Sequence, residues 1–381
     1  NESVERDIKM KHFLLFGWLL GLGQVASGQA EVLRHFELAE GTNPHGTPVV
    51  QNSTVYGTTV YGGSNGYGTI YRVASDGSGF IVLHHFSGAN GAYPVAGLVR
   101  RGQILYGVAA YGGAGGAGVT FRIRSDGTGF RVLNHFKGIR GVNPYSRLHL
   151  AQFGPVWYLY GTTTNGGANG TGVIFRLRTN GTGFSVVHHF SSGPLGTRPA
   201  GGVVRVGTKL YGVAGSGGAY DGGLLYRLND SGGGFTVLRH LSVSDGYGAV
   251  FNTPISDGVW LYGSLQYGGN LGYGTVYKIG LAGANFAVLH HFSGANGAYP
   301  TSELVGSGVK LYGTTFGGGL NAVGAVFTIK TDGTGFAVLE HCSNQTGANP
   351  AAGLALKDGL LYGAASLGGA NGLGSIFKVA L

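Results

Sequence analysis

The chain has 381 residues, of which 78, about one in five, are glycine, and only 11% are charged. Globular proteins average about 7% glycine and about 25% charged residues. With no Gly-X-Y period and only 10 prolines the chain is not collagen, and its 43% hydrophobic content is too high for a disordered protein. Abundant glycine together with 21 Tyr and 20 Phe is typical of short strands and tight turns.

The formal net charge is +9. Six of the positive side chains recur at one repeat position: Arg72, Arg122, Arg176, Arg227, Lys278 and Lys378. Because they are spread along the chain and do not form a stripe, we expect a solvated strand face and no nucleic-acid partner. The single cysteine, Cys342, excludes an internal disulfide and a thiolate zinc site, and we expect it to be a small core residue.

The N-terminal region has the pattern of an export signal. The only methionine is Met10, so we predict that residues 1–9 are upstream, non-native residues. Residues 10–28 combine a positively charged start, a short apolar run and small residues before a cleavage point, which is typical of a signal peptide. The apolar run is shorter than the ~20 residues of a membrane span. We therefore predict a secreted or periplasmic protein, with no integral membrane segment and one domain over 29–381.

A tripeptide, Leu/Val-Tyr-Gly, recurs seven times at intervals of 50 to 54 residues. Its tyrosines are Tyr56, Tyr106, Tyr160, Tyr211, Tyr262, Tyr312 and Tyr362. A second signature of the type Val-Leu-x-His-Phe precedes each unit, first at Val32 and last at Val338. A fixed period of this length indicates a solenoid, a propeller or another array.

Each unit is predicted to form four short strands. In the second unit the strands cover residues 97–100, 104–109, 119–123 and 130–136. The pair Asp126-Gly127 predicts a hairpin between the last two. Four antiparallel strands per repeat are typical of a propeller blade.

The two ends of the repeat array are complementary. The first recurring element, Val32 to Phe36, is a lone fourth strand, and the last unit ends at Leu381 with its third strand. The N-terminal strand can therefore complete the seventh blade, which leaves no open edge in the ring. We predict an all-β fold: a seven-bladed β-propeller with four antiparallel strands per blade, closed by the N-terminal strand.

The repeat run LYGTTxxGGxxGxGxxFxxxxDGTGFxVLHHF resembles the GloVer tandem-repeat family of exported bacterial proteins. The resemblance covers residues 31–381 and holds in every unit. It implies export but supplies no catalytic residues. Members of that family usually carry a C-terminal anchor, and since the sequence shows none after the last repeat, we expect this protein to differ from them in lacking one.

One histidine of the second signature is present in all seven copies: His35, His85, His135, His189, His240, His291 and His341. These residues lie on the predicted outermost strands, where the sevenfold repetition holds them far apart. We therefore predict structural hydrogen bonds and not a metal site. The residue before each histidine varies, as a solvent-facing position would.

A site that performs chemistry must break the repetition. At two predicted axis-facing positions of the innermost strands, the large polar exceptions are His45, Tyr145, Arg147 and Glu303, and Asn252 is another exception between them. Since innermost strands border the central channel, we expect these side chains to converge there. The alternative is sequence drift in a tolerant scaffold, with Arg147 and Glu303 simply paired.

The first functional hypothesis is a hydrolase acting at the channel on a small lactone, an ester or a glycan. Asp221, Asp245, Asn252 and Glu303 offer the oxygen ligands that Ca²⁺ prefers, so Ca²⁺ is a candidate cofactor. His45 or Glu303 is the expected general base. Arg147 or Tyr145 is the expected clamp for an oxyanion or the substrate. A lyase that uses Tyr145 or His45 as base is a variant of this hypothesis.

The second hypothesis is a non-catalytic module that binds a glycan or a cell surface. Tyr67, Tyr93, Tyr273 and Tyr299 are expected at loop tips, where their rings can stack on sugars. Two loops, 88–94 and 294–300, are identical in sequence, which suits multivalent binding. A structural spacer without a ligand is the third hypothesis. In the first two cases we expect a monomer that binds a small molecule or a glycan.

Overall fold

The computed structural model describes residues 30–249 and 251–381. The predicted upstream residues 1–9 and the predicted signal peptide 10–28 lie outside the described residues. Within the described part of the chain, no helix is both long enough and apolar enough to cross a membrane.

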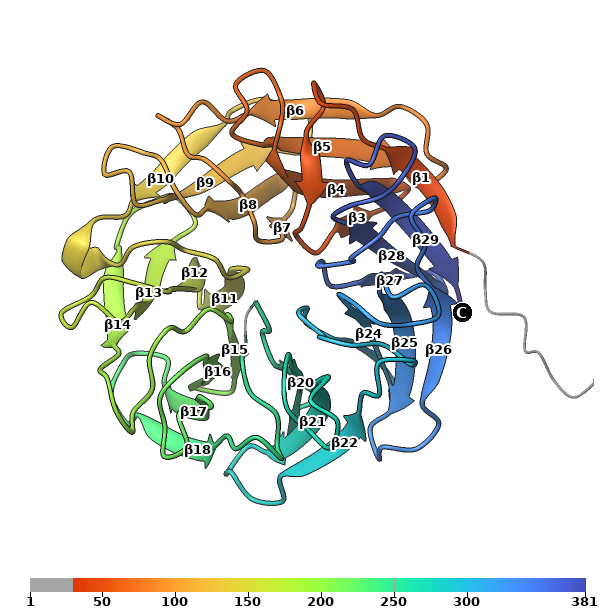
Figure 1. The fold of residues 1–381 in the computed structure, drawn as a ribbon. Coiled ribbons are helices and arrows are strands. Elements are labelled where there is room, and N and C mark those ends of the chain that lie inside the picture. Colours follow the sequence, from red (N-terminus) through yellow and green to blue (C-terminus); the bar gives the residue numbers. More distant parts are fainter. Residues whose placement is uncertain (1–29, 250) are drawn as a thin grey trace, which may run out of the picture.

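Seven four-stranded antiparallel sheets form a ring, as predicted, and each sheet is one blade of a β-propeller (Figure 1). Blade 1 contains β3 (Val49–Gln51), β4 (Thr54–Tyr61), β5 (Thr69–Ala74) and β6 (Ile81–His85), and β2 (Thr42–Pro44) also pairs with β4. Blade 2 contains β7 (Val99–Arg101), β8 (Ile104–Ala109), β9 (Val119–Arg124) and β10 (Arg131–His135). Blade 3 contains β11 (His149–Phe153), β12 (Val156–Thr163), β13 (Val173–Arg178) and β14 (Ser185–His189), and the 3-10 helix η1 (Gly138–Arg140) precedes it.

Blade 4 contains β15 (Val203–Val206), β16 (Lys209–Ala214), β17 (Leu224–Asn229) and β18 (Thr236–His240). Blade 5 contains β19 (Ile255–Ser256), β20 (Trp260–Leu265), β21 (Thr275–Gly280) and β22 (Ala287–His291). Blade 6 contains β23 (Val305–Ser307), β24 (Lys310–Thr315), β25 (Ala325–Lys330) and β26 (Ala337–His341). Blade 7 contains β27 (Ala355–Lys357), β28 (Leu360–Ala365), β29 (Ser375–Ala380) and the N-terminal strand β1 (Glu31–His35).

The ring is closed by the N-terminal strand, which confirms the predicted closure. Strand β1 pairs antiparallel with β29, with Glu31 opposite Lys378 and His35 opposite Ser375 (Figure 1). Without β1, the outer edge of β29 would present unpaired backbone groups.

The hydrophobic core consists of seven clusters, each lying between two neighbouring blades. The Leu-Tyr-Gly signature builds these interfaces. Tyr106 is 2% exposed and belongs to the cluster that joins blades 2 and 3. The glycine after it, Gly107, makes room for the ring of Phe121 on the next strand, because a Cβ atom there would lie 2.5 Å from Cζ of Phe121. A side chain at position 107 would therefore displace a core aromatic ring.

The recurrent histidines are structural, as predicted. In every blade, Nδ1 accepts a hydrogen bond of 3.0 to 3.2 Å from a backbone N–H in the connection between the second and third strands. For His35 the donor is Ala370, so this bond also ties the N-terminal strand to blade 7. Cys342 is buried, also as predicted, and burial raises the pKa of its thiol to about 12.

Two expectations about solvent-facing positions are wrong. The variable residue before each recurrent histidine is buried or half-buried, and in most blades its side chain contacts the next blade. The His84 ring, for example, stacks on Phe130 with centroids 3.7 Å apart. The recurrent Arg and Lys column is half-buried as well, and four of its members donate to backbone carbonyls of the following blade: Arg176, Arg227, Lys278 and Lys378. Both columns therefore join blades.

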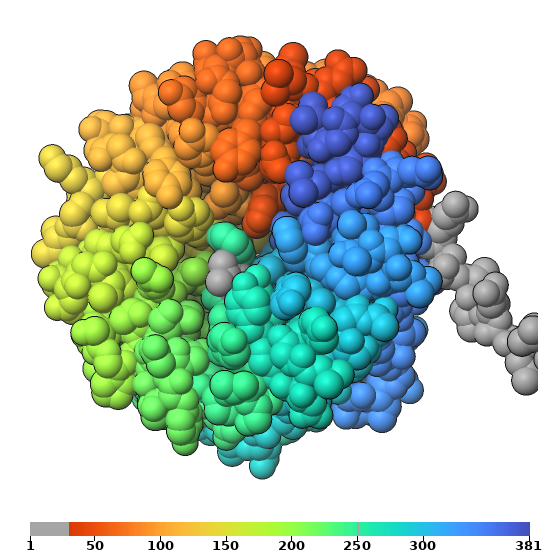
Figure 2. Space-filling view, in the orientation of Figure 1, coloured from red at the N-terminus to blue at the C-terminus, as the bar shows by residue number. Residues whose placement is uncertain are grey.

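The two faces of the disc differ. One face, which we call the loop face, carries the connections between the second and third strands and those from each blade to the next. Isolated backbone bridges such as Ala92 to Tyr111 and Ala298 to Gly317 hold these connections together. The opposite, turn face carries the short turns within the hairpins. Figure 2 shows that segments far apart in sequence, coloured orange, green and blue, meet near the centre of the disc.

Candidate functional site

Each blade sends an extended segment from the loop face along the axis into its innermost strand. These segments lie just before the innermost strands, which in blade 2 begin at Val99 and not at residue 97 as predicted. Two levels of side chains, two residues apart, face the axis. Residues of both levels line a narrow cavity of about 20 Å³, and all four predicted catalytic residues are among them: His45, Tyr145, Arg147 and Glu303. Their convergence is thus observed, while their roles stay predictions.

The level nearer the loop face is aromatic. The ring of Phe251 contacts His45 edge to face with centroids 5.1 Å apart, and it contacts Tyr145 in the same way at 5.9 Å. The Tyr145 hydroxyl lies 2.6 Å from that of Tyr111. Sequence reasoning missed Phe251, because an apolar residue among small ones resembles ordinary packing. Its backbone has a φ of 64°, a left-handed conformation that is rare for bulky residues.

The deeper level is closed by an ion pair. Nη1 of Arg147 lies 2.7 Å from Oε1 of Glu303, and Nε of Arg147 donates to the Leu98 carbonyl at 3.1 Å. The Glu303 side chain is 10% exposed and that of Arg147 is 33% exposed. The pair joins blade 3 to blade 6 across the axis, so the pairing that sequence reasoning kept as an alternative is present.

The electrostatics of the aromatic level favour neutral groups. Burial lowers the pKa of His45 below its usual value, although backbone hydrogen bonding with Val95 acts in the opposite direction. Burial, followed by the contact with Tyr111, raises the pKa of Tyr145. At pH 7 His45 is therefore a neutral imidazole that can accept a proton, and Tyr145 is a neutral phenol that can donate a hydrogen bond.

A wider cavity opens on each side of this constriction. Because the inner segments run from the loop face to the turn face, residues earlier in each segment lie nearer the loop face. The loop-face mouth, about 280 Å³, is lined by Tyr145, Thr164, Asn165, Arg198, Ala200, Gly215, Ser216, Ala249 and Phe251. The turn-face mouth, about 350 Å³, is lined by Val99, Arg100, Arg147, Leu148, His149, Leu150, Val203, Val204, Thr253, Pro254, Ile255 and Glu303.

The predicted calcium ligands are not brought together. The carboxylate of Asp245 is bound by Arg239 of the outermost strand β18, and that of Glu303 is bound by Arg147 at the axis. Asp221 is exposed in the loop between β16 and β17, where its carboxylate accepts from the Gly217 N–H at 3.1 Å.

Asn252 is buried and donates to the carbonyls of Ser264 and Pro300. Among the described residues, no three His, Cys, Asp or Glu side chains lie close enough together to hold a metal ion. The four residues of the expected calcium site therefore do not form one cluster in the described part of the chain, where two of the carboxylates have guanidinium partners in different parts of the disc, and calcium binding stays a prediction.

The loop face carries two equivalent groups of three tyrosines. We call Tyr61, Tyr67 and Tyr93 platform A, and Tyr267, Tyr273 and Tyr299 platform B. In platform A, Tyr93 contacts Tyr61 at 5.3 Å and Tyr67 at 5.9 Å between ring centroids. In platform B, Tyr299 contacts Tyr267 at 5.6 Å and Tyr273 at 6.0 Å. Of the four tyrosines expected at loop tips, only Tyr67 is exposed, while the central Tyr93 and Tyr299 and also Tyr273 are half-buried.

The two platforms differ in their surroundings. From platform A, aromatic contacts continue through Tyr111, 5.8 Å from Tyr93, to Tyr145, 6.1 Å from Tyr111. Tyr145 in turn contacts Phe251, so one row of rings leads from the loops of blades 1 and 2 to the channel mouth. Platform B instead extends to Tyr247, whose ring lies 5.5 Å from that of Tyr267.

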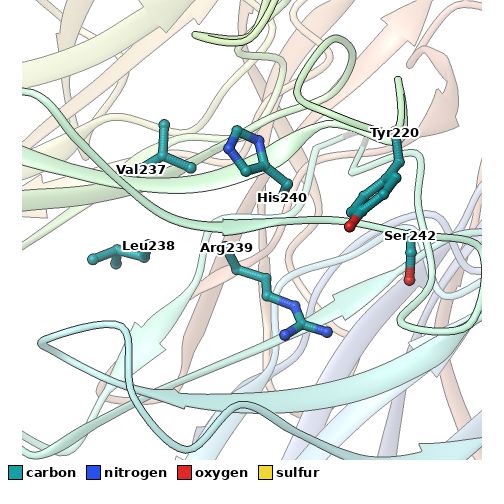
Figure 3. A pocket seen from close by; sticks show the side chains of 6 residues that line it. All are labelled: Tyr220, Val237, Leu238, Arg239, His240 and Ser242. Atoms are coloured by element: carbon teal, nitrogen blue, oxygen red, sulfur yellow. The ribbon is translucent and has the colours of Figure 1, made fainter.

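A further shallow pocket, about 380 Å³, lies on the rim of blade 4, and Figure 3 shows its side chains. They are Tyr220, Val237, Leu238, Arg239, His240 and Ser242. The two residues that could do chemistry have structural partners, since Arg239 binds Asp245 and His240 accepts from the Ala219 N–H. This pocket therefore follows from blade packing.

Comparison with solved structures finds similar folds at low sequence identity. An oligogalacturonate lyase from Vibrio parahaemolyticus has a TM-score of 0.59 and 10% identity, over 92% of this chain and 93% of that chain. A putative 6-phosphogluconolactonase from Bacteroides uniformis has a TM-score of 0.51 and 14% identity, over 86% and 96%. A puromycin-hydrolyzing peptidase from Mycobacterium tuberculosis has a TM-score of 0.54 and 11% identity, over 93% of this chain and 54% of that chain. These similarities concern the fold.

A search of curated proteins gives no significant match. The model of the Gloeobacter/Verrucomicrobia repeat, in contrast, matches residues 23–207, 152–308 and 208–381, and so covers all seven blades. The chain therefore belongs to the Gloeobacter/Verrucomicrobia repeat family.

Proposed function

We propose that this protein is an exported glycan-binding propeller that recognises sugar rings with platforms A and B on its loop face. Export rests on the signal peptide predicted over residues 10–28. The observation that carries the proposal is the conformation of the two central tyrosines. Tyr93 and Tyr299 have φ angles of 58° and 59°, in the left-handed region.

The residues at the equivalent position of other blades show why the left-handed conformation of Tyr93 and Tyr299 bears on function. Three other blades have asparagine there with similar φ angles: Asn43, Asn143 and Asn349. Asparagine tolerates the left-handed region, whereas a bulky residue pays about 1–3 kcal/mol. The amides of Asn143 and Asn349 also donate to backbone carbonyls, bonds that a tyrosine cannot make there. The blade therefore does not require tyrosine, and strained residues of this kind are typical of binding sites.

The chemistry of the platforms suits carbohydrates. Tyrosine rings offer apolar faces for the C–H groups of a sugar and hydroxyls for its polar edge. Tyr61 is 50% exposed and Tyr67 is 37% exposed in platform A, and Tyr267 is 38% exposed in platform B. Two equivalent platforms on one rigid disc can engage a polymer at two points, which raises the overall affinity without new contacts.

Affinity electrophoresis in gels that contain soluble polysaccharides tests this function. Tyr93→Asn and Tyr299→Asn restore the residue that three other blades use, so we expect both variants to fold with an unchanged or slightly higher Tm. Each single variant should lose part of the retardation, and the double variant should lose it all. Tyr220→Asn is the matched control, because Tyr220 is 69% exposed but belongs to neither platform. A double variant that is retarded as strongly as the parent protein contradicts the proposal.

Hydrolysis at the channel is the second candidate function, and one observation favours it. The row of rings from platform A passes Tyr145, a hydrogen-bond donor that lines the loop-face mouth, and continues through Phe251 to His45, a neutral base that lines the constriction below it. At an ester or lactone, a water that loses its proton to His45 could add to the carbonyl carbon while Tyr145 donates to the developing oxyanion; the C–O bond then breaks and the leaving oxygen takes the proton back from His45. At a glycan, the same water could attack the anomeric carbon while Tyr145 donates its proton to the leaving glycosidic oxygen. Glu303 is less suited to be the base, since Arg147 already binds its carboxylate.

A lyase reaction on an acidic sugar, with His45 or Tyr145 as the base, is the variant of this candidate. Chromatography of glycan, lactone and aryl-ester substrates after incubation tests both reactions. His45→Val should abolish turnover without loss of retardation in gels, because blade 2 has Val95 at this position. If the parent protein converts none of these substrates but still binds glycans, the catalytic candidate is wrong and the binding function remains.

A further inference from the structure

Blade 3 presents an unusual column of side chains to the axis. Tyr145, Arg147 and His149 follow one another at alternate positions. At the level of His149 the other six blades carry only aliphatic residues: Val49, Val99, Val204, Ile255, Val305 and Ala355. A histidine in an otherwise aliphatic ring is not required by the blade packing.

His149 lies in the turn-face mouth together with two arginines, Arg100 and Arg147. Nε2 of His149 accepts from the Arg205 N–H at 3.4 Å, and within residues 30–249 and 251–381 no group accepts from the Nδ1–H of the neutral ring. Burial, followed by the charges of Arg147 and Arg205, lowers the pKa of His149 to about 4, so the ring is neutral at pH 7.

Arg100 is the second unusual feature. Its side chain is half-buried, and its Nε is buried without a hydrogen-bond partner in the described chain. A buried guanidinium N–H without an acceptor is costly, and carboxylates satisfy such groups well. The equivalent residues of blades 1, 3 and 7 are Val50, Leu150 and Leu356, so an arginine is not needed for packing.

The charge balance of this mouth is positive. Arg147 and Glu303 neutralise each other at 2.7 Å. Arg205, whose backbone supports His149, is paired with Asp230, also at 2.7 Å. Among the described residues that line this mouth, Arg100 is therefore the cation without a counterion. The remaining walls are largely aliphatic, with Val99, Leu148, Val203 and Ile255 among them.

We propose that the turn-face mouth of the channel binds a small organic carboxylate with an apolar body, its carboxylate held by Arg100 and the Nδ1–H of His149 and its body against the aliphatic walls. The cavity of about 350 Å³ has room for a ligand of the size of an aromatic acid. This site lies on the other side of the Arg147–Glu303 pair from platforms A and B. It is therefore separate from the glycan sites.

Isothermal titration with benzoate and with its neutral analogue benzamide tests the proposal on the full chain. We expect millimolar or tighter binding of benzoate, and no binding of benzamide. Arg100→Leu takes the residue of blade 3 and should weaken benzoate binding at least tenfold, which corresponds to ~1.4 kcal/mol. Arg131→Leu is the matched control, because it removes the same charge from an exposed position of β10 and should bind like the parent protein.

A second readout does not depend on affinity. The imidazole resonances of His149 should shift when benzoate is added, and they should do so equally in Tyr93→Asn, since platform A lies on the opposite face. His149→Val, which restores the aliphatic ring, should fold normally and weaken benzoate binding. The proposal is overturned if the parent protein does not bind benzoate at millimolar concentration, or if Arg100→Leu binds it as well as the parent does.

Discussion

Arg239 holds the carboxylate of Asp245 in a bidentate grip, with Nη2 2.7 Å from Oδ1 and Nε 3.1 Å from Oδ2. The same two positions, six residues apart, are bonded in four other blades, in one by another arginine–carboxylate pair and in three by different chemistry. The other pairs are Arg34 with Glu40, His84 with Asn90, Asn134 with Arg140, and His290 with Asn296. Each pair fastens the outermost strand to the connection that follows it. The seven repeats therefore contain several solutions to one structural task.

These solutions predict an exchange that can be tested. Asp245→Ala removes the acceptor from a half-buried guanidinium and should lower the free energy of unfolding by about 1–3 kcal/mol. The double variant Arg239→His with Asp245→Asn installs the His–Asn pair of the outermost strands of blades 1 and 5, and it should regain most of that loss. Urea denaturation at pH 7.5, where the new histidine is neutral, measures both. A double variant less stable than Asp245→Ala would show that the pairs are not interchangeable.

The fold could be predicted because repetition makes each signal appear seven times. The Leu-Tyr-Gly and His-Phe signatures gave the blade boundaries, and the unmatched fourth strand at Val32 gave the closure. The convergence of His45, Tyr145, Arg147 and Glu303 also followed from the sequence. Side chains at an inward-facing position of every blade converge at the axis, because the blades are arranged in a ring around it.

Other features could not be predicted in the same way. Asp245 was expected to be a metal ligand, because a carboxylate has no visible partner until the fold brings Arg239 beside it. The recurrent Arg and Lys column was expected in solvent, since the following blade that accepts its hydrogen bonds lies more than fifty residues ahead. The left-handed conformation of Tyr93 was hidden because its neighbours in sequence are those of an ordinary loop. An alignment of the repeats that compares the two positions six residues apart, as in Arg34 and Glu40, would have revealed Arg239 as the partner of Asp245.

Removal of the closing strand should destabilise the whole ring. The two chains to compare begin at Ala30 and at Gly41. The shorter chain leaves β29 with an unpaired edge and lacks Leu33 and Phe36 of the cluster between blades 7 and 1. Two large buried side chains contribute about 1.5–3 kcal/mol each through burial alone. We expect a fall in Tm of many degrees, measured by circular dichroism. Equal melting of the two chains would mean that β1 contributes little to closure.

The ion pair in the channel should respond unequally to the loss of either partner. Glu303 is 10% exposed, and Arg147 is 33% exposed. Arg147→Ala therefore leaves a shielded carboxylate without its cation, which in buried pairs costs up to about 3–5 kcal/mol. Glu303→Gln leaves a cation that water can reach, and its amide oxygen can still accept a hydrogen bond. We expect Arg147→Ala to be clearly the more destabilising of the two in urea denaturation at pH 7.

The histidines that stack between blades make stability depend on pH. The rings of His84, His188 and His290 lie on Phe130, Phe235 and Phe336 with centroids 3.7, 4.4 and 3.6 Å apart. Burial, with a smaller contribution from the adjacent histidine, lowers the pKa of each of the three to about 4, against an unfolded value of 6.5. Between these two pH values the unfolded chain binds protons that the folded protein does not. Stability should therefore be full above about pH 6.5 and fall as the pH drops towards 4.

His188 offers a clean test of this effect, because no side chain in the described part of the chain bonds its imidazole, whereas His84 and His290 are bonded to Asn90 and Asn296. Arginine occupies the same position in Arg34 and Arg239, where the guanidinium lies 5.0 and 4.6 Å from the ring of Phe80 or Phe286. His188→Arg keeps a planar group on Phe235 but does not titrate in this range. The Tm of the parent should drop between pH 7.5 and 5, and that of His188→Arg should drop less. If both proteins lose the same number of degrees, proton uptake by the stacked histidine is not a cause of the acid sensitivity.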